Sequence, residues 1–92
     1  MIKSIKSKPL KNFFEKGDTS KLQPHHIRRI RILLGNLHLA TSPEMMDQSG
    51  YKFHELKGDR RGFYSVWING NYRLTFRFIG LDAFDVDYED YH

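Results

Sequence analysis

The 92-residue chain contains no cysteine, which excludes disulfides and thiolate metal sites and is compatible with a reducing compartment. No apolar run approaches the roughly 18 residues that a membrane-spanning helix needs, and residues 1–9 lack the apolar stretch of a secretory signal. We therefore expect a cytoplasmic protein with no membrane association. A glycine-rich phosphate loop is also absent, because Gly58, Gly62 and Gly70 stand where turns are expected, so nucleotide-dependent phosphoryl transfer is excluded.

Positive and negative charges are unevenly distributed along the chain. Residues 1–81 hold all 15 Lys and Arg residues against six acids, a net charge of +9, whereas residues 82–92 hold five acids and no Lys or Arg. A cationic body of this kind suggests a polyanionic partner, with nucleic acid favoured over a membrane surface. A basic surface that merely keeps the protein soluble gives the same charge, so charge alone leaves both interpretations open.

The first half of the chain has the spacing of two helices. Residues 8–16 combine a proline suited to the first turn, an apolar stripe and a glycine stop at Gly17. A second helix is predicted from Pro24 to a point before Ser42, with apolar residues at helical spacing at Ile27, Ile30, Leu34 and Leu37. Residues 1–8 indicate a short edge strand or a lead into the first helix.

From Tyr51 onward the hydrophobic period changes to that of strands. Asn69 and Gly70 predict a two-residue hairpin between the second and third of four runs, YKFHELK, GFYSVWI, NYRLTFRFI and AFDVDYEDYH. Connections this short leave no room for crossover helices, so an antiparallel-dominated sheet is expected. The predicted fold is α+β, in the order β-α-α-β-β-β-β, with two N-terminal helices packed on the sheet in a single domain spanning residues 1–92.

Alternation within the strand-like runs assigns side chains to faces. In the third run one row is predicted to pack under the helices and the other to face outward, namely Tyr72, Leu74, Phe76 and Phe78 against Arg73, Thr75 and Arg77. In the last run an apolar row is predicted to end in two titratable groups, in the order Phe84, Val86, Tyr88, Asp90 and His92. A final strand from Ala83 to about Glu89 would then bring Asp90 and His92 to His54 and Arg73. Trp67 is expected in the core.

The histidines and acids do not predict a metal site. His25, His26 and His38 are interpreted as structural or solvated. His25 and His26 fall in the first turn of the second predicted helix, where the helix dipole disfavours a protonated imidazole, and their spacing to His38 places it on a different face. Three acids of one parity, Asp85, Asp87 and Glu89, could bind a cation, but a solvated acidic strand is the favoured interpretation. We expect neither a metal ion nor a cofactor.

Metal-independent cleavage of RNA requires that the 2′ hydroxyl lose a proton, that charge on the phosphorane be stabilised and that the 5′ oxygen gain a proton. Histidine performs proton transfer near neutral pH, and Lys or Arg stabilises phosphate charge. The chain offers candidates for each of these steps, with His54 and His92 for proton transfer, Lys57 and Arg73 for the phosphate, Arg77 for binding RNA, and Asp90 and Tyr91 to tune an imidazole, stack on a base or donate a proton. Such residues occur on many surfaces, so this pattern alone leaves a structural role open.

Several short motifs strengthen the nuclease interpretation through a resemblance. LKGDR at residues 56–60, NYRLTF at residues 71–76 and the terminal DYH follow in that order, and the C-terminal half of the chain resembles the HigB-type toxins of the RelE and ParE superfamily. These are toxin halves of bacterial type II toxin–antitoxin pairs. The resemblance implies a RelE-like fold and a ribosome-dependent messenger RNA endoribonuclease (an mRNA interferase) that cleaves by acid–base catalysis and inhibits translation.

The resemblance also implies roles for individual residues. His54, Asp90, Tyr91 and His92 would do or support the acid–base work, and Lys57 and Arg73 would stabilise the scissile phosphate. One departure is visible, because the family often has proline after the strand histidine and this chain has Glu55. Strand parity points Glu55 away from His54, so we expect it to alter local pairing and charge more than chemistry.

Two other functions stay open. A ParE-like member of the same superfamily would poison a protein such as DNA gyrase without chemistry of its own, and a non-catalytic RNA-binding module would use Trp67 and the tyrosines to stack on bases. A protein-binding inhibitor has no need of His54, Lys57 and His92 together, which separates these alternatives. For a toxic nuclease we expect a cognate HigA-type helix-turn-helix antitoxin with an acidic surface, and messenger RNA on the ribosome with contacts to ribosomal RNA.

Overall fold

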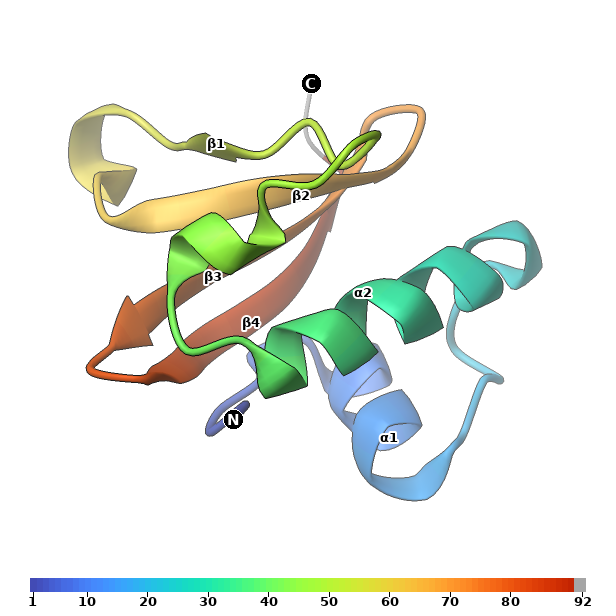
Figure 1. Cartoon of the computed structure of the whole chain (residues 1–92). Coiled ribbons are helices and arrows are strands. Elements are labelled where there is room, and N and C mark those ends of the chain that lie inside the picture. Colours follow the sequence, from blue (N-terminus) through green and yellow to red (C-terminus); the bar gives the residue numbers. More distant parts are fainter. Residues whose placement is uncertain (91–92) are drawn as a thin grey trace.

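Two helices lie on one side of a twisted sheet in the computed structural model, which describes residues 1–90 (Figure 1). Helix α1, Lys8–Lys16, begins where the hydroxyl of Ser7 accepts the amide N–H of Leu10 at 3.2 Å and ends at Gly17. Helix α2, Ile27–Leu39, follows a 3₁₀ turn η1, Pro24–His26, so the predicted second helix starts as a tighter turn. Within the described part of the chain, no helix has both the length and the apolar character that crossing a membrane would require.

Four antiparallel strands form the sheet in chain order: β1 His54–Glu55, β2 Phe63–Asn69, β3 Tyr72–Ile79 and β4 Asp82–Asp90. The first is much shorter than predicted, because Lys52 has a left-handed φ of 49° and a 3₁₀ turn η3 begins at Gly58. The predicted hairpin between β2 and β3 is present, but its two connecting residues are Gly70 and Asn71, because the register shifts between Trp67 and Asn69.

The N-terminal segment supplies the first β element of the predicted order. Its pairing is reduced to two isolated parallel bridges, Ile2 with Ala83 and Ile5 with Val86, along the outer edge of β4. The amide of Lys3 donates to the carbonyl of Ala83 at 2.8 Å, and the terminal amine lies 3.1 Å from the carboxylate of Asp82. These bonds cover the edge of β4 that would otherwise present unpaired backbone groups.

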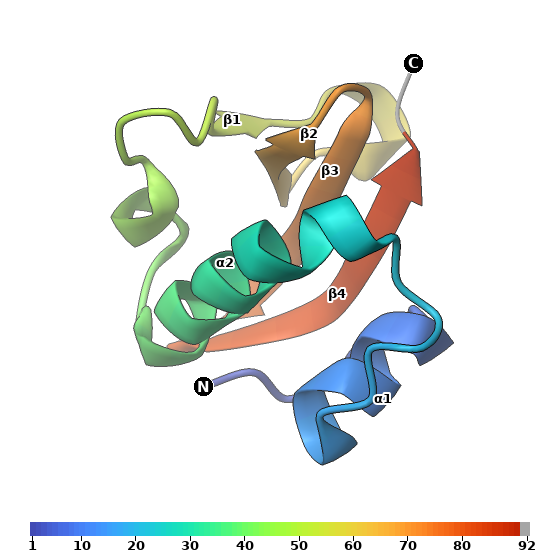
Figure 2. The ribbon, with the colours of Figure 1, turned by 90° about the vertical axis from the view of Figure 1, so that its right-hand side faces the viewer.

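The core fills the space between the sheet and α2, which runs across one face of the strands (Figure 2). On the helix, the buried side chains are Ile30, Leu33, Leu34 and Leu37. Leu74 and Phe76 of β3 are fully buried against them, and Tyr72 and Phe78 pack partly buried at the margin of the core. The predicted helix-facing row of β3 is therefore confirmed, and the protein has the expected α+β fold.

Strand β4 departs from simple alternation at a bulge. Asp85 has φ 54°, and two residues of β4, Asp85 and Val86, stand opposite Phe76 alone, so the register shifts there. Beyond the shift Phe84 pairs with Arg77, while Ala83 is fully buried on the helix side. The predicted row of Phe84, Val86 and Tyr88 is wrong at Phe84, because the extra residue reverses the faces N-terminal to it.

Candidate active site

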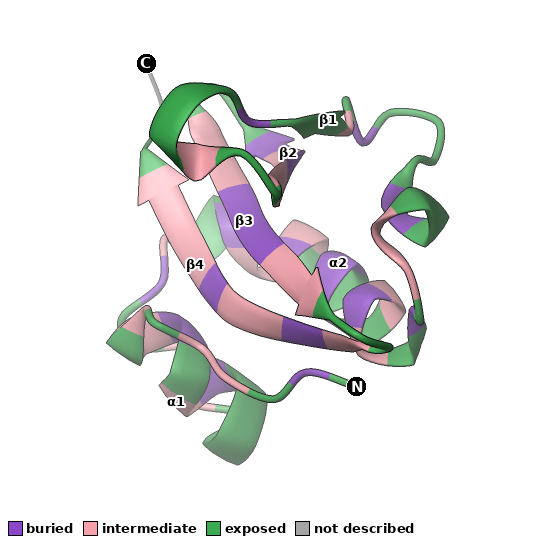
Figure 3. Cartoon of the chain, turned by 90° about the vertical axis from the view of Figure 1, so that its left-hand side faces the viewer, coloured by how far each residue is buried: buried purple, intermediate pink, exposed green. Residues whose placement is uncertain are grey.

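The face of the sheet opposite α2 is turned toward the viewer in Figure 3. Across β2 and β3 the paired residues on this face are Phe63 with Arg77, Ser65 with Thr75 and Trp67 with Arg73. We call this the uncovered face. The prediction that Arg73 and Arg77 lie on it is confirmed by the register, since residues paired across an antiparallel ladder lie on one face.

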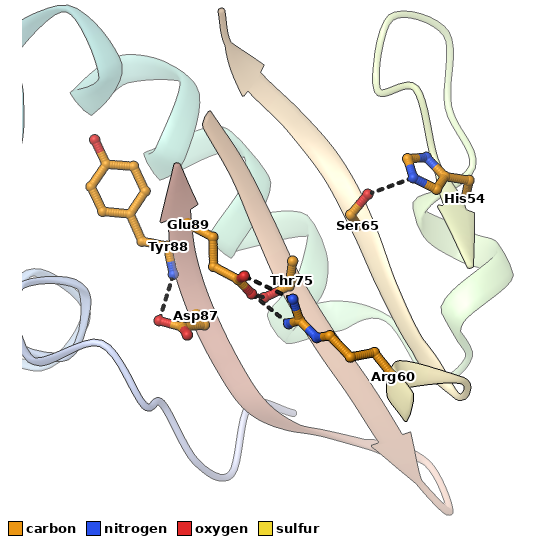
Figure 4. Close-up of polar contacts among 7 residues, drawn as sticks. All are labelled: His54, Arg60, Ser65, Thr75, Asp87, Tyr88 and Glu89. Carbon is orange, nitrogen blue, oxygen red and sulfur yellow. Dashed lines mark hydrogen bonds and ion pairs between the residues drawn. The ribbon is translucent and has the colours of Figure 1, made fainter. Parts of the chain in front are cut away.

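A bidentate ion pair crosses the middle of the uncovered face (Figure 4). Two nitrogens of Arg60 lie 2.9 and 2.6 Å from the carboxylate oxygens of Glu89, and the hydroxyl of Thr75 donates to the same carboxylate. The hydrogen bonds from Arg60, opposed in part by burial and assisted by Thr75, hold the pKa of Glu89 below its ordinary value. Glu89 is therefore a carboxylate engaged by protein cations and not a solvated acid.

Sequence reasoning did not place Arg60 or Glu89 in the candidate site. Glu89 was grouped with Asp85 and Asp87, yet Glu89 and Asp85 each bond an arginine, Arg77 reaching Asp85 at 2.6 Å. Among residues 1–90 no cluster of three His, Asp or Glu side chains has metal-binding geometry. A signal for Arg60 existed, because it is the last residue of LKGDR.

His54 lies at the edge of the uncovered face, on β1. Its Nδ1 lies 3.2 Å from the carbonyl oxygen of Lys52, and its Nε2 lies 3.4 Å from the hydroxyl of buried Ser65. Since a carbonyl only accepts, Nδ1 carries the proton in this contact, and the lone pair of Nε2 faces Ser65. His54 is exposed, and a bound molecule that takes the place of the Ser65 hydroxyl at Nε2 can give up a proton there.

Lys57 reaches the same region from the segment that follows β1. It is exposed, directly precedes the turn η3, Gly58–Arg60, and lines a shallow hollow together with His54, Glu55 and Leu56. Glu55 pairs with Tyr64 and accepts the amide N–H of Gly62 at 3.0 Å, whereas His54 pairs with Ser65. Glu55 and His54 therefore lie on opposite faces, as strand parity predicted.

Arg73 lies on the uncovered face near the start of β3, paired with Trp67 on one side and Glu89 on the other. Its Nε and Nη1 atoms are buried, and neither has a hydrogen-bond partner among residues 1–90. Buried N–H groups without a partner are costly, and an anion with phosphate geometry would satisfy them. The uncovered face therefore offers a guanidinium that can receive an oxyanion on β3 and an imidazole on β1, with β2 between them.

Asp90 does not join His54 and Arg73. It pairs with Tyr72 and so points to the helix side of the sheet, whereas Arg73 faces the other way. On that side, burial raises the pKa of Tyr88, and the nearby Tyr72 and Asp90 raise it further. The prediction that Asp90 meets His54 and Arg73 is wrong for this residue, because the register of β4 with β3 sets its face, and Tyr91 and His92 lie outside the described residues.

Trp67 is not a core residue, contrary to expectation. Its side chain is half-buried on the uncovered face, its Nε1 donates to the carbonyl of Gly70 at 3.0 Å, and the ammonium of Lys52 lies 4.3 Å from the ring centroid. The register pairs it with Arg73, and this pairing decides its face. It therefore belongs to the surface that surrounds the candidate site.

The three remaining histidines play structural or solvated roles, as expected. His26 is buried with Nδ1 2.6 Å from the hydroxyl of Tyr88, and burial lowers its pKa. Nδ1 of His38 accepts the amide N–H of Ile2 at 3.1 Å, and His25 is exposed beside His26. None of the three lies on the uncovered face.

Comparisons with known proteins agree with this arrangement. A family model described as RelE-like toxin of type II toxin-antitoxin system HigB matches residues 3–92. A curated protein of Proteus vulgaris named Endoribonuclease HigB is 46% identical over 92 residues, which cover 100% of both chains. The similarity therefore includes the helical half as well as the strands.

Proposed function

The chain belongs to the HigB-like family of RelE-like toxins of type II toxin–antitoxin systems, and on this premise we propose that it is an endoribonuclease that cuts messenger RNA on the ribosome. Cleavage would inhibit translation in the cytoplasm. Residues 1–92 act as one toxin domain in this proposal.

The observation that supports the mechanism is that the buried Nε and Nη1 of Arg73, which have no hydrogen-bond partner among residues 1–90, lie on the same face as Nε2 of His54. In the proposed reaction His54 accepts the proton of the 2′ hydroxyl, whose oxygen forms a bond to phosphorus. The bond from phosphorus to the 5′ oxygen breaks, and that oxygen takes a proton from His92, assisted by Tyr91. The products are a 2′,3′-cyclic phosphate and a 5′ hydroxyl.

Arg73 and Lys57 stabilise the charge that develops on the phosphorane, and this role is strongest in the transition state. No metal ion takes part, because side chains supply the base, the acid and the positive charge. Arg77 binds the RNA backbone outside the scissile phosphate. Asp90, on the helix side of the sheet, is given no part in proton transfer.

Membership in a type II system implies an antitoxin partner. We infer that this antitoxin is of the HigA helix-turn-helix type and presents an acidic surface, because residues 1–81 carry a net charge of +9. The second partner is messenger RNA in the ribosome, where contacts with ribosomal RNA would position the codon.

The test compares ribosome-bound with naked messenger RNA, with and without EDTA, and maps the cut ends. We expect cuts only on ribosomes, unaffected by EDTA, and loss of cutting in His54→Ala. His25→Ala is the matched control, since His25 is equally exposed but lies away from the uncovered face. Intact transcripts together with arrested DNA replication after induction in cells would refute the proposal and favour the gyrase-poisoning alternative.

A further inference from the structure

The Arg60–Glu89 ion pair joins two segments that the sheet itself keeps apart. Arg60 lies in the turn η3 between β1 and β2, whereas Glu89 lies on β4, and β2 and β3 stand between them in the sheet order. The side chain of Arg60 extends over these strands to reach the carboxylate (Figure 4). We call this pair the clasp.

The geometry of the clasp is more specific than stability requires. The side chains of Arg60 and Glu89 are 39% and 22% exposed, and ion pairs with such access to water contribute little to stability. Two parallel hydrogen bonds nevertheless fix the planes of both groups, and Thr75 orients the carboxylate further. A pair of this kind specifies a position more than it stabilises the fold.

The segments that the clasp joins carry the two halves of the proposed site. Lys57 lies three residues before Arg60. The turn η3 begins at Gly58 and is followed by Gly62, and two glycines, here with φ values of 68° and 92°, leave the backbone of this segment adaptable because they lack a Cβ atom. Glu89 lies at the end of β4, directly before the C-terminal residues that hold the proposed proton donor. β1 pairs with β2 through two residues only, so the strand ladder holds this region weakly.

We propose that Arg60 and Glu89 are positioning residues, which hold the Lys57 segment at a set distance from the C-terminal end of β4. This inference rests on the proposed nuclease function. Neither residue touches the substrate in this role. Loss of the clasp misplaces Lys57 relative to the scissile phosphate while RNA continues to bind.

The experiment measures steady-state cleavage on programmed ribosomes for Arg60→Ala, Glu89→Gln and the double variant, beside thermal melts. Each single variant should lose about 10–100-fold in kcat with KM within about twofold of the parent. A catalytic group misplaced by about 1 Å can lower the rate by about 100-fold. The double variant should lose no more than the worse single variant, since both changes break the same pair.

Asp85→Asn is the matched control. Asp85 is also a carboxylate of β4 that forms an ion pair with an arginine, but its partner Arg77 lies on the neighbouring strand β3 and not in the turn η3. Its kcat should stay within about twofold of the parent. If Glu89→Gln fails to fold, Arg60→Lys tests the same point, since lysine keeps the charge and loses the two-pronged geometry. It should lose kcat with an unchanged melt.

The outcomes separate the clasp from the nuclease proposal. A parent protein that leaves ribosome-bound RNA intact overturns the nuclease function and the clasp with it. A parent that cuts, with Arg60→Ala raising KM at constant kcat, overturns the clasp alone and makes Arg60 an RNA-binding residue. Losses that multiply in the double variant would likewise overturn it.

Discussion

Replacing Arg73 by methionine should stabilise the protein while it abolishes most cleavage. Nε and Nη1 of Arg73 are buried without a hydrogen-bond partner among the described residues, and an unsatisfied buried polar group costs about 1–3 kcal/mol. Methionine keeps an unbranched apolar stem against Trp67 and removes the charge. We therefore expect the free energy of unfolding to rise by about 1 kcal/mol or more, which corresponds to a melting temperature about 4–8 °C higher for a domain of this size.

The same substitution removes the group assigned to the phosphorane. Loss of one transition-state donor typically lowers kcat by about 10²–10³-fold, and binding of RNA should fall much less. Thermal melts in phosphate-free buffer and single-turnover cleavage on ribosomes measure the two effects. Added inorganic phosphate should raise the melting temperature of the parent and leave Arg73→Met unchanged, because ligands stabilise only the state that binds them.

Arg77→Met is the matched control on the same strand and face. Arg77 already bonds Asp85 at 2.6 Å with 41% of its side chain exposed, so its removal should lower stability by about 0.2–1 kcal/mol. The reasoning is refuted if Arg73→Met melts below the parent, which would give its guanidinium a structural role. Equal losses of kcat and RNA affinity would also refute it.

Three further outcomes are expected. Deleting Tyr91 and His92 should leave the melting temperature nearly unchanged and abolish both toxicity and cleavage; a variant that melts like the parent and still kills on induction would remove His92 from the mechanism. RNA affinity should fall linearly with salt on logarithmic axes, and filter binding of Arg77→Ala should show a shallower slope at unchanged kcat. Burial lowers the pKa of His26 in the folded state, so the unfolded chain binds the proton more readily. The resulting stability is therefore present above pH 6.5 and lost as pH falls through the lowered pKa. In urea melts, the free energy of unfolding of His26→Asn should depend less on pH in that window than that of the parent.

Prediction from the residue pattern succeeded where a single hydrophobic period runs through a whole strand or helix. The helix-facing row of β3 follows from alternation, and Leu74 and Phe76 are fully buried as predicted. The same reasoning failed at Phe84, because the bulge in β4 reverses the faces N-terminal to it without changing the local residue pattern. It also failed at Trp67, because alternation places Trp67 in one row with Phe63 and Ser65 but does not tell which face of β2 the helices cover.

The candidate site also contains some residues that the sequence predicts and others that only the structure reveals. His54, Lys57 and Arg73 were selected by chemistry and by family resemblance, and their side chains lie on or beside the uncovered face. The residue pattern does not indicate Arg60 and Glu89, because 29 residues separate them and their bond depends on how the turn η3 folds over the sheet. A side-chain pair of this kind is invisible to any local window.

The amino-acid sequence by itself determined the α+β class, the order of the elements, the cationic body and the family, because each follows from composition, local periodicity or short motifs. Only the tertiary structure decided which face of β4 holds Asp90, that Nε and Nη1 of Arg73 are buried without a hydrogen-bond partner in the described part of the chain, and that Arg60 reaches Glu89. The physical reason is that burial, strand register and ion pairing are properties of segments brought together by folding, and the free energy of each depends on partners far away in the chain.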